Sequence, residues 1–254
     1  MLLEGKRGLV LSVTNKNSIG WGIAEAAHRH GATVGVGGQN ERMLERVSDL
    51  IGAGPRYAAF MCDFGMDDQI DQLVEEVKHK FGAIDFFVHS AAYAPKDALT
   101  GRFIDCSRED FATALDVSCY SLVRMCRALE PIMNDDASIL TLSYLGSQRA
   151  VGNYNVMGVA KAALESAVRY LAFDLGKRGI RVNTISPGPI NTVAARGVPG
   201  LLDMIGYVQE KAPLKREFGQ AEVGGAGVYL LSDLSRGVTG QIIYVDSGYN
   251  IVGM

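Results

Sequence analysis

The stretch RGLVLSVTNKNSIGWGIAEAAHRHGATVGV, residues 7–36, contains two short apolar runs separated by a polar turn and a helical pattern. The first run, Arg7 to Val13, is apolar and rich in branched side chains, as in a strand that is buried on both faces. A helical pattern follows from Ser18 to His30, and Thr33 to Val36 resumes the strand pattern. The stretch therefore predicts a strand, a crossover helix and a second strand parallel to the first.

The same alternation continues to the end of the chain. Further strand candidates, each separated from the next by a plausible helix, are Tyr57 to Met61, Ile84 to His89, Ser138 to Leu142, Arg181 to Ile185 and Gln241 to Val245. Strands that alternate with helices form parallel sheets with helices on both faces. The sequence therefore predicts an α/β protein with a single-domain, Rossmann-like, doubly wound parallel sheet of about seven strands.

Composition limits the classes of function. The 254 residues commonly make one core in an open α/β sheet, and no repeat or linker divides them, so we expect one domain over residues 1–254. Apolar residues make up 48%, charged residues 21%, and the net charge is −3, which suits a soluble globular protein. This balance gives no reason to expect a nucleic-acid partner or an anionic membrane as a partner.

The cysteines and the first apolar run bear on metals and location. The four cysteines form no CxxC pair, and the four histidines supply no metal-site spacing beside them, so we expect free thiols and no metal site. The apolar run from Gly8 to Val13 is too short for a membrane span or the core of a signal peptide. We therefore expect a cytoplasmic protein without membrane insertion.

The first crossover is the expected place for a nucleotide. Parallel sheets of this type bind ligands beyond the carboxyl ends of their strands, where the strand order reverses. Residues 12–22 contain no GxGxxG, yet they provide small side chains and a helix N-terminus that suits a pyrophosphate. Ser18 could donate a hydrogen bond to a phosphate or cap the helix, and the two roles are compatible.

Residues after the second strand bear on the choice of cofactor. NAD enzymes often place an acid here on the adenosine ribose, and NADP enzymes place an arginine for the 2′-phosphate. The neutral pair Gln39 and Asn40 favours NADH, whereas Arg42 keeps NADPH open. After the third strand, Asp63 could bond the adenine amino group or cap the helix near Asp67. The small residues Ser90, Ala91 and Ala92 after the fourth strand leave room for ribose and nicotinamide.

Residues 143–161 carry the candidate catalytic groups. Tyr154 and Lys161 are seven positions apart, which is about two helical turns at roughly 100° per residue, so both side chains leave from nearly the same face. Each residue alone has an ordinary structural explanation, but their joint spacing favours catalysis. Tyr144 precedes Tyr154 by ten positions. The charge of Lys161 would lower the pKa of the nearby tyrosine.

A long irregular segment lies between Pro187 and Ala212. Loops of this length inside a domain are commonly functional, and we expect a substrate-binding lid at about residues 188–212. Its apolar residues would share one face of a helix: Leu201, Leu202, Met204, Ile205 and Val208. A surface helix that packs on the core is the alternative.

These features resemble the short-chain dehydrogenase/reductase superfamily and, within it, the enoyl-acyl-carrier-protein reductases of bacterial type II fatty acid synthesis. The wider superfamily carries Tyr-x-x-x-Lys, but the residue four before Lys161 is Met157, and Tyr154 with six intervening residues takes the place of that pattern. The other motifs that carry the resemblance are Ser18-Ile19, His89-Ser90, Ala94-Pro95, residues 140–144 and residues 189–192. Ser12 and Ser247 stand where the family usually has glycine.

The resemblance implies reduction of the carbon–carbon double bond of trans-2-enoyl thioesters by hydride from NADH. Tyr154 would hydrogen-bond the thioester carbonyl, and either it donates the proton or it holds the enolate while water donates the proton. Lys161 would bond the nicotinamide ribose, and Tyr144 would border the acyl group. The remaining cofactor contacts would come from Ser12, Ser18, Ile19, Gln39, Asp63, Phe64, Ser90, Ala91, Ala92, Ile190 and Thr192. The substrate would also be lined by Ala94, Met157, Pro189 and Met204.

The resemblance further implies a homotetramer, with subunit contacts on helices from about Arg108 to Leu129 and Tyr154 to Leu175. Acyl carrier protein would deliver the substrate, and it is acidic. Basic residues around the lid could attract it by local charge, although ordinary solvated charge is equally compatible with them. These residues are Arg196, Lys211, Lys215 and Arg216.

Two other functions compete with this interpretation. A carbonyl reductase or alcohol dehydrogenase on the same scaffold would carry Tyr-x-x-x-Lys, which Met157 contradicts. A regulatory protein that binds a nucleotide without turnover would have a broken catalytic set, whereas Tyr144, Tyr154 and Lys161 are all present.

Overall fold

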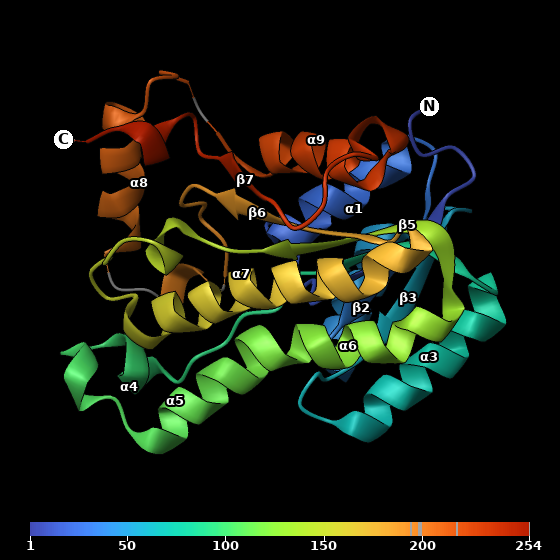
Figure 1. Ribbon diagram of the computed structural model, residues 1–254, viewed down its shortest axis with the longest axis horizontal. Helices are drawn as coiled ribbons and strands as arrows, with labels where there is room; N and C mark the ends of the chain where they lie inside the picture. The colour runs from blue at the N-terminus through green and yellow to red at the C-terminus, as the bar shows by residue number, and fades with distance from the viewer. Residues whose placement is uncertain (194, 198–199, 217, 254) are drawn as a thin grey trace.

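A computed structural model of the protein describes residues 1–193, 195–197, 200–216 and 218–253. Across these residues, seven parallel strands form one sheet in the order β3-β2-β1-β4-β5-β6-β7 (Figure 1). The strands are β1 (Arg7–Leu11), β2 (Thr33–Gly38), β3 (Tyr57–Met61), β4 (Ile84–His89), β5 (Met133–Leu142), β6 (Arg181–Pro187) and β7 (Ile242–Val245). The predicted doubly wound α/β sheet is confirmed.

Helices cover both faces of the sheet (Figure 1). The α-helices are α1 (Ile19–Arg29), α2 (Glu41–Ile51), α3 (Asp67–Phe81), α4 (Lys96–Leu99), α5 (Arg108–Leu115), α6 (Ser121–Leu129), α7 (Asn155–Leu175), α8 (Leu201–Lys211) and α9 (Gln220–Leu231). A π-helical turn, η2 (Asp116–Tyr120), joins α5 to α6, and short 3-10 turns include η4 (Leu145–Ser147) and η6 (Ala195–Gly197).

Alternation along the strands assigns each helix to a layer. On β1, Leu9 and Leu11 belong to an apolar cluster with side chains of α3, α6 and α7, whereas Val10 packs in a second cluster with side chains of α1, α2 and α9. Neighbouring residues of a strand point to opposite faces, so an uninterrupted apolar strand must be covered on both sides. The continuous apolar run that predicted a buried strand therefore fixes the two helical layers.

The structure differs most from the predicted boundaries in two places, and the other bounds differ by at most two residues. Strand β5 begins at Met133 rather than Ser138, because Met133 pairs with Ile84 before a register shift restores pairing at Phe86. The helix expected from Arg108 to Leu129 is interrupted by the π-helical turn η2. Polar residues at the start of β5 hide its strand character from a hydrophobic pattern, and a helical period does not reveal one inserted residue.

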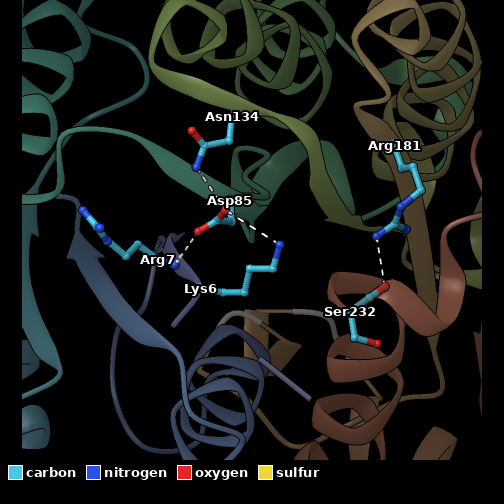
Figure 2. A network of polar contacts seen from close by, with 6 residues as sticks. All are labelled: Lys6, Arg7, Asp85, Asn134, Arg181 and Ser232. Atoms are coloured by element: carbon cyan, nitrogen blue, oxygen red, sulfur yellow. Dashed lines mark hydrogen bonds and ion pairs between the residues drawn. The ribbon is translucent and has the colours of Figure 1, made fainter. Parts of the chain in front are cut away.

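Polar side chains fasten the strands at their amino ends (Figure 2). The Asp85 carboxylate accepts hydrogen bonds from the Arg7 backbone N–H at 2.8 Å and from Asn134 Nδ2 at 3.0 Å, and Lys6 Nζ lies 3.8 Å from it. Elsewhere at this edge, Arg181 donates to the Ser232 carbonyl oxygen at 3.2 Å. These contacts tie β1, β4, β5, β6 and α9 together on the edge away from the candidate site.

The strand order reverses between β1 and β4, whose carboxyl ends face the segments after Leu11 and His89. A doubly wound sheet offers its ligand crevice at such a point. No helix within the described residues is long and apolar enough to cross a membrane.

Candidate active site

The turn after β1 is built from local hydrogen bonds. The Ser18 Oγ accepts from the backbone N–H groups of Thr14 and Asn15 at 3.1 and 3.2 Å. Ser18 occupies the N-cap position of α1, but its hydroxyl makes no capping bond, so of its two predicted roles the side-chain cap is wrong. The first N–H groups of α1 therefore lack a side-chain acceptor and suit an anion.

Small residues line the crevice where a dinucleotide is expected. A Cβ on Gly20 would lie 2.9 Å from Ser90 Oγ, so a side chain at this position in the first turn of α1 would press on the side chain of the residue that follows β4. Ser12 has φ of 67°, the left-handed region that favours glycine. Ala91 is buried and Ala92 is exposed. The small residues and the uncapped helix start fit a pyrophosphate and its ribose, and Ile19 lies in that first turn.

The residues expected near adenosine are paired with one another. Gln39 Nε2 donates to Asp63 Oδ2 at 3.0 Å, which joins the ends of β2 and β3. Asp63 Oδ1 accepts from the Gly65 N–H at 2.9 Å, and Met66 rather than Asp63 is the N-cap of α3, so the helix-cap alternative for Asp63 is wrong. Asn40 caps α2 through the Met43 N–H, at 3.1 Å.

Two aromatic rings occupy the space between β3, β4 and the catalytic end. Phe64 stacks on the His89 imidazole, with ring centroids 5.3 Å apart. His89 bonds Ser121 Oγ at 2.8 Å and Thr141 Oγ1 at 3.1 Å, and burial lowers its pKa to about 3. The neutral imidazole therefore joins β4 to β5 and α6 beneath the crevice, and Phe64 lies at its edge.

The two candidate tyrosines lie side by side. Tyr154 is the N-cap residue of α7, and its ring lies 4.9 Å from that of Tyr144 in an edge-to-face arrangement. Gly146 fits against them so closely that a Cβ on it would lie 2.4 Å from Tyr154 Cδ1. Within the described part of the chain, the Tyr154 hydroxyl has no hydrogen-bond partner. Its phenol is thus positioned by packing and available to a ligand.

Lys161 lies deeper, with 3% of the residue exposed. Its Nζ donates to the Leu142 carbonyl oxygen at 2.7 Å, and burial lowers its pKa to about 8. Among the described residues no hydrogen bond joins it to Tyr154. Burial, followed by the neighbouring Tyr144, raises the pKa of Tyr154 well above its usual value. The predicted lowering of the tyrosine pKa by Lys161 is therefore wrong, because desolvation of the phenolate dominates.

The expected substrate residues approach the tyrosines from two sides. Ala94 and Met157 are buried in one apolar cluster that Tyr154 contacts. From α8, the Met204 sulfur accepts a hydrogen bond from the Tyr144 hydroxyl at 2.9 Å. Pro189 is buried and Ile190 packs on the α1 side of the sheet. Thr192 Oγ1 accepts from the Ala195 N–H at 3.0 Å, which closes the turn that follows.

The segment predicted as a lid contains η6 and α8, and residues 194, 198 and 199 of it lie outside the described residues. The predicted apolar face of α8 is only partly buried: Val208 is buried, Met204 and Ile205 are half-buried, and Leu202 is 69% exposed. The Leu201 side chain is outside the described part. The helix thus rests on Tyr144 while it presents apolar surface to solvent.

Comparison with known proteins identifies the family. The profile of a family described as Enoyl-(Acyl carrier protein) reductase matches residues 13–250. The enoyl-acyl-carrier-protein reductase (NADH) FabI of Nostoc sp. is 48% identical over 99% of both chains.

The chain belongs to the enoyl-acyl-carrier-protein reductase family.

Solved reductases of this family have the same fold. The crystal structure from Aquifex aeolicus, named for the NADH enzyme, gives a TM-score of 0.96 at 42% identity and covers 100% of both chains. The Bacillus cereus reductase, solved with NADP+ and indole naphthyridinone, gives a TM-score of 0.97 at 45% identity and covers 100% of this chain and 99% of that one. The predicted family and fold are confirmed.

The sequence interpretation missed two polar residues of this reductase, Glu165 and Ser118. Buried Glu165 accepts hydrogen bonds from Ser143 and Ser147, each at 2.5 Å. Ser118, in η2, bonds both the N–H and the carbonyl oxygen of Tyr93, beside the predicted substrate residue Ala94. An acid four positions after Lys161 within an apolar helix was the signal for Glu165, whereas nothing in the sequence marked Ser118.

Within the described residues, no group of three or more His, Cys, Asp and Glu residues could hold a metal ion.

Proposed function

We propose that this protein reduces the carbon–carbon double bond of trans-2-enoyl thioesters on acyl carrier protein and that Tyr154, Lys161 and Tyr144 carry the reaction. The activity is that of an NADH-dependent enoyl reductase of fatty acid synthesis, because full-length relatives with that name are 44–48% identical to the chain. The observation that carries the residue assignment is the unpartnered Tyr154 phenol, packed on Tyr144 at the start of the helix that holds Lys161.

The chemistry of the donors matches the reaction. NADH, when bound, supplies the hydride for the β-carbon of the enoyl thioester. As charge develops on the thioester oxygen, the neutral Tyr154 phenol donates a hydrogen bond to it, and a preorganised donor of this kind stabilises an enolate. The Lys161 ammonium adds positive charge from a buried position and holds the nicotinamide ribose. Tyr144, with its pKa raised to about 12 by burial, stays neutral and borders the acyl group.

The remaining cofactor contacts follow from the crevice. Ser12, Ser18, Ile19 and Thr192 would surround the pyrophosphate, and Ser90, Ala91, Ala92 and Ile190 the nicotinamide ribose and ring. Gln39, Asp63 and Phe64 would meet the adenosine. The Asp63 carboxylate beside Gln39 supports NADH over NADPH, because a negative charge there opposes a 2′-phosphate. NADPH stays open as a second cofactor, since the related Bacillus cereus reductase was solved with NADP+.

We propose a single domain over residues 1–254, with residues 188–212 as a substrate-binding lid. The hydrogen bond from Tyr144 to Met204 supports this role of α8, since it places that helix against a proposed catalytic ring. Ala94, Met157, Pro189 and Met204 would line the acyl group.

An acidic acyl carrier protein would approach this lid. The basic residues of this chain in and next to the lid are all exposed: Arg196, Lys211, Lys215 and Arg216. Lys211 also lies 3.3 Å from Glu210, which reduces the local charge. If all four basic residues help to attract the carrier protein, changing them to serine raises the Michaelis constant for a carrier-linked substrate at low salt. The Michaelis constant for a short coenzyme A thioester stays unchanged. An unchanged constant for the carrier-linked substrate would remove the patch from the proposal.

The outer surface of α7 supports a homotetramer. Tyr170 and Phe173 are 72% and 80% exposed, and Tyr120 on the neighbouring π-helical turn is also exposed. Large exposed aromatic side chains on adjacent helices mark an interaction surface. Light scattering would report four times 27.3 kDa, and Phe173→Asp would reduce that mass. A monomeric wild type would overturn the assignment.

The four free thiols, of which Cys62 and Cys126 are buried, suit the reducing cytoplasm in which we place the protein.

One assay tests the activity. NADH oxidation is followed at matched concentrations of crotonyl thioester and acetoacetyl thioester, and the series is repeated with NADPH. We expect turnover with the crotonyl substrate alone and a higher kcat/KM with NADH. Turnover with acetoacetyl thioester alone would indicate a carbonyl reductase, and cofactor binding without turnover would indicate a regulatory protein.

A further inference from the structure

Glu165 is a buried acid that the reaction described above does not use. It lies on α7 one turn after Lys161, and only 6% of the residue is exposed. A buried carboxylate is costly unless hydrogen bonds satisfy it. Here, Ser143 Oγ and Ser147 Oγ both donate to the same oxygen, Oε1. No ion pair joins Glu165 to a basic residue in the described part of the chain, so the two hydroxyls are its hydrogen-bond donors, and the charge of Lys161 one turn earlier adds a favourable interaction.

The two serines flank the segment that carries Tyr144. Ser143 follows β5, and its N–H donates to the Ile185 carbonyl oxygen on β6 at 2.8 Å. Ser147 ends the short turn η4, and its N–H donates back to the Tyr144 carbonyl oxygen at 2.9 Å. Both ends of the five-residue loop from Ser143 to Ser147 are therefore hydrogen-bonded to one side chain of α7, the Glu165 carboxylate.

This loop also supports the second tyrosine. Gly146 lies between Tyr144 and Tyr154, and a Cβ on Gly158 of α7 would lie 2.7 Å from the Gly146 carbonyl oxygen. The loop is therefore pressed onto the first turns of α7, directly against the Tyr154 ring. A shift of the loop would move Tyr144 and remove packing from Tyr154 together.

We propose that Glu165 is a positioning residue, which fixes both active-site tyrosines by fastening the Ser143–Ser147 loop to α7. This inference rests on the proposed roles of Tyr144 and Tyr154. Displacement of a reacting group by about 1 Å can reduce a rate 100-fold, so small movements of the loop are enough to affect turnover. The Glu165 carboxylate also raises the pKa of Lys161, which is proposed to hold the ribose, so NADH affinity is compared between variants that keep and variants that remove this charge.

The test compares four variants in the crotonyl thioester assay. Glu165→Ala is expected to lower kcat about 30-fold while its Michaelis constant for NADH stays within twofold of that of Glu165→Gln, which removes the same charge. Glu165→Gln keeps an oxygen acceptor in place and should retain wild-type kcat within about threefold. The double variant Ser143→Ala/Ser147→Ala should lose about as much as Glu165→Ala. Adding Glu165→Ala to it should cause no further loss, because coupled groups act as a unit. Glu75→Ala, an exposed acid on α3 away from the loop, is the control and should match wild type.

Other outcomes overturn the proposal. These are an unchanged kcat in Glu165→Ala, losses that multiply when the glutamate and serine changes are combined, or a parallel loss of NADH affinity in the serine double variant, which keeps the carboxylate, so that the loss marks general damage. If Glu165→Ala does not fold, the serine double variant decides, because it leaves the carboxylate in place: wild-type kcat would refute the positioning role, and a selective loss of kcat would support it. An inactive wild type would instead refute the proposed function itself.

Discussion

The two ends of the crevice are held by different kinds of contact. At the nucleotide end, most polar side chains bond groups close by in the chain: Ser18 reaches Thr14, four residues away, and Asp63 reaches Gly65, two residues away. At the catalytic end, the contacts are long-range: Lys161 reaches Leu142 across 19 positions, and Tyr144 reaches Met204 across 60. The nucleotide end is therefore built mainly from local turns, with the Gln39–Asp63 bond linking two strand ends across 24 positions, whereas the catalytic end depends on the packing of several elements at once.

This difference predicts that single changes have large effects at the catalytic end and small ones at the nucleotide end. The strongest test is Tyr154→Phe, which removes the proposed donor but keeps the ring packed on Tyr144. We expect kcat to fall at least about 100-fold, as for the loss of an oxyanion donor, with little change in the Michaelis constant for NADH. Tyr229→Phe on α9 is the matched control. A Tyr154→Phe enzyme with more than a tenth of wild-type kcat would contradict the assignment.

The second test uses pH. Burial lowers the pKa of Lys161 to about 8, so its ammonium is present below that pH and is lost above it. NADH affinity, followed by fluorescence titration, should therefore weaken about tenfold between pH 7 and 9, since one unit of pH above a pKa removes about nine-tenths of the charge. Lys161→Met should bind weakly at every pH. A wild-type dissociation constant that is flat over this range would show that the ammonium does not hold the ribose.

The other titratable groups around Lys161 do not account for this pH dependence of NADH affinity. Its titratable neighbours are Cys119, Glu165 and His89. Burial lowers the pKa of His89 to about 3 and raises that of Cys119 above its usual value. The His89 charge therefore does not change between pH 7 and 9, and Cys119 keeps its proton through most of that range.

The third test changes a residue at the nucleotide end. Asp63→Asn removes the negative charge beside Gln39 but keeps the shape of the side chain. We expect the ratio of kcat/KM for NADPH to that for NADH to rise about threefold to fivefold, because one charge several ångströms from a phosphate near water contributes less than about 1 kcal/mol. Asp68→Asn, on an exposed position of α3, should leave the ratio unchanged. An unchanged ratio in Asp63→Asn would separate Asp63 from cofactor choice.

The smallest expected effect concerns the two serines in left-handed backbone. Ser12 and Ser247 have φ of 67° and 58°, where a side chain costs about 1–2 kcal/mol. Ser12→Gly and Ser247→Gly should each raise the free energy of unfolding by about 0.5 kcal/mol, after the greater chain entropy of glycine is subtracted. Urea denaturation would measure it. Ser48→Gly in α2 should instead destabilise the protein by a similar amount, and destabilisation by all three changes would refute the strain argument.

The sequence predicted most of the fold, because a parallel sheet covered on both faces produces apolar runs that are visible without coordinates. It also marked Tyr144 and Tyr154 as candidate residues, although not the contact between their rings. The depth of Lys161 and the role of Glu165 were not predictable in this way, since both depend on β5, β6 and α7 meeting in space. Hydrogen bonds between residues 18 to 60 positions apart leave no local pattern. The pKa of Tyr154 was predicted with the wrong sign because burial is a property of the folded chain.

The π-helical turn η2 sets a length requirement for the helix that runs along the catalytic end. Ser118, within the turn, holds Tyr93, and Ser121, directly after it, holds His89. A regular α-helix advances about 100° per residue, so deletion of one residue from the turn would rotate the preceding segment by that angle relative to the following one. One of the two serines would then face away from its partner. Substitution can therefore vary the composition of this helix, but the number of residues between Ser118 and Ser121 is fixed by the contacts of these two serines.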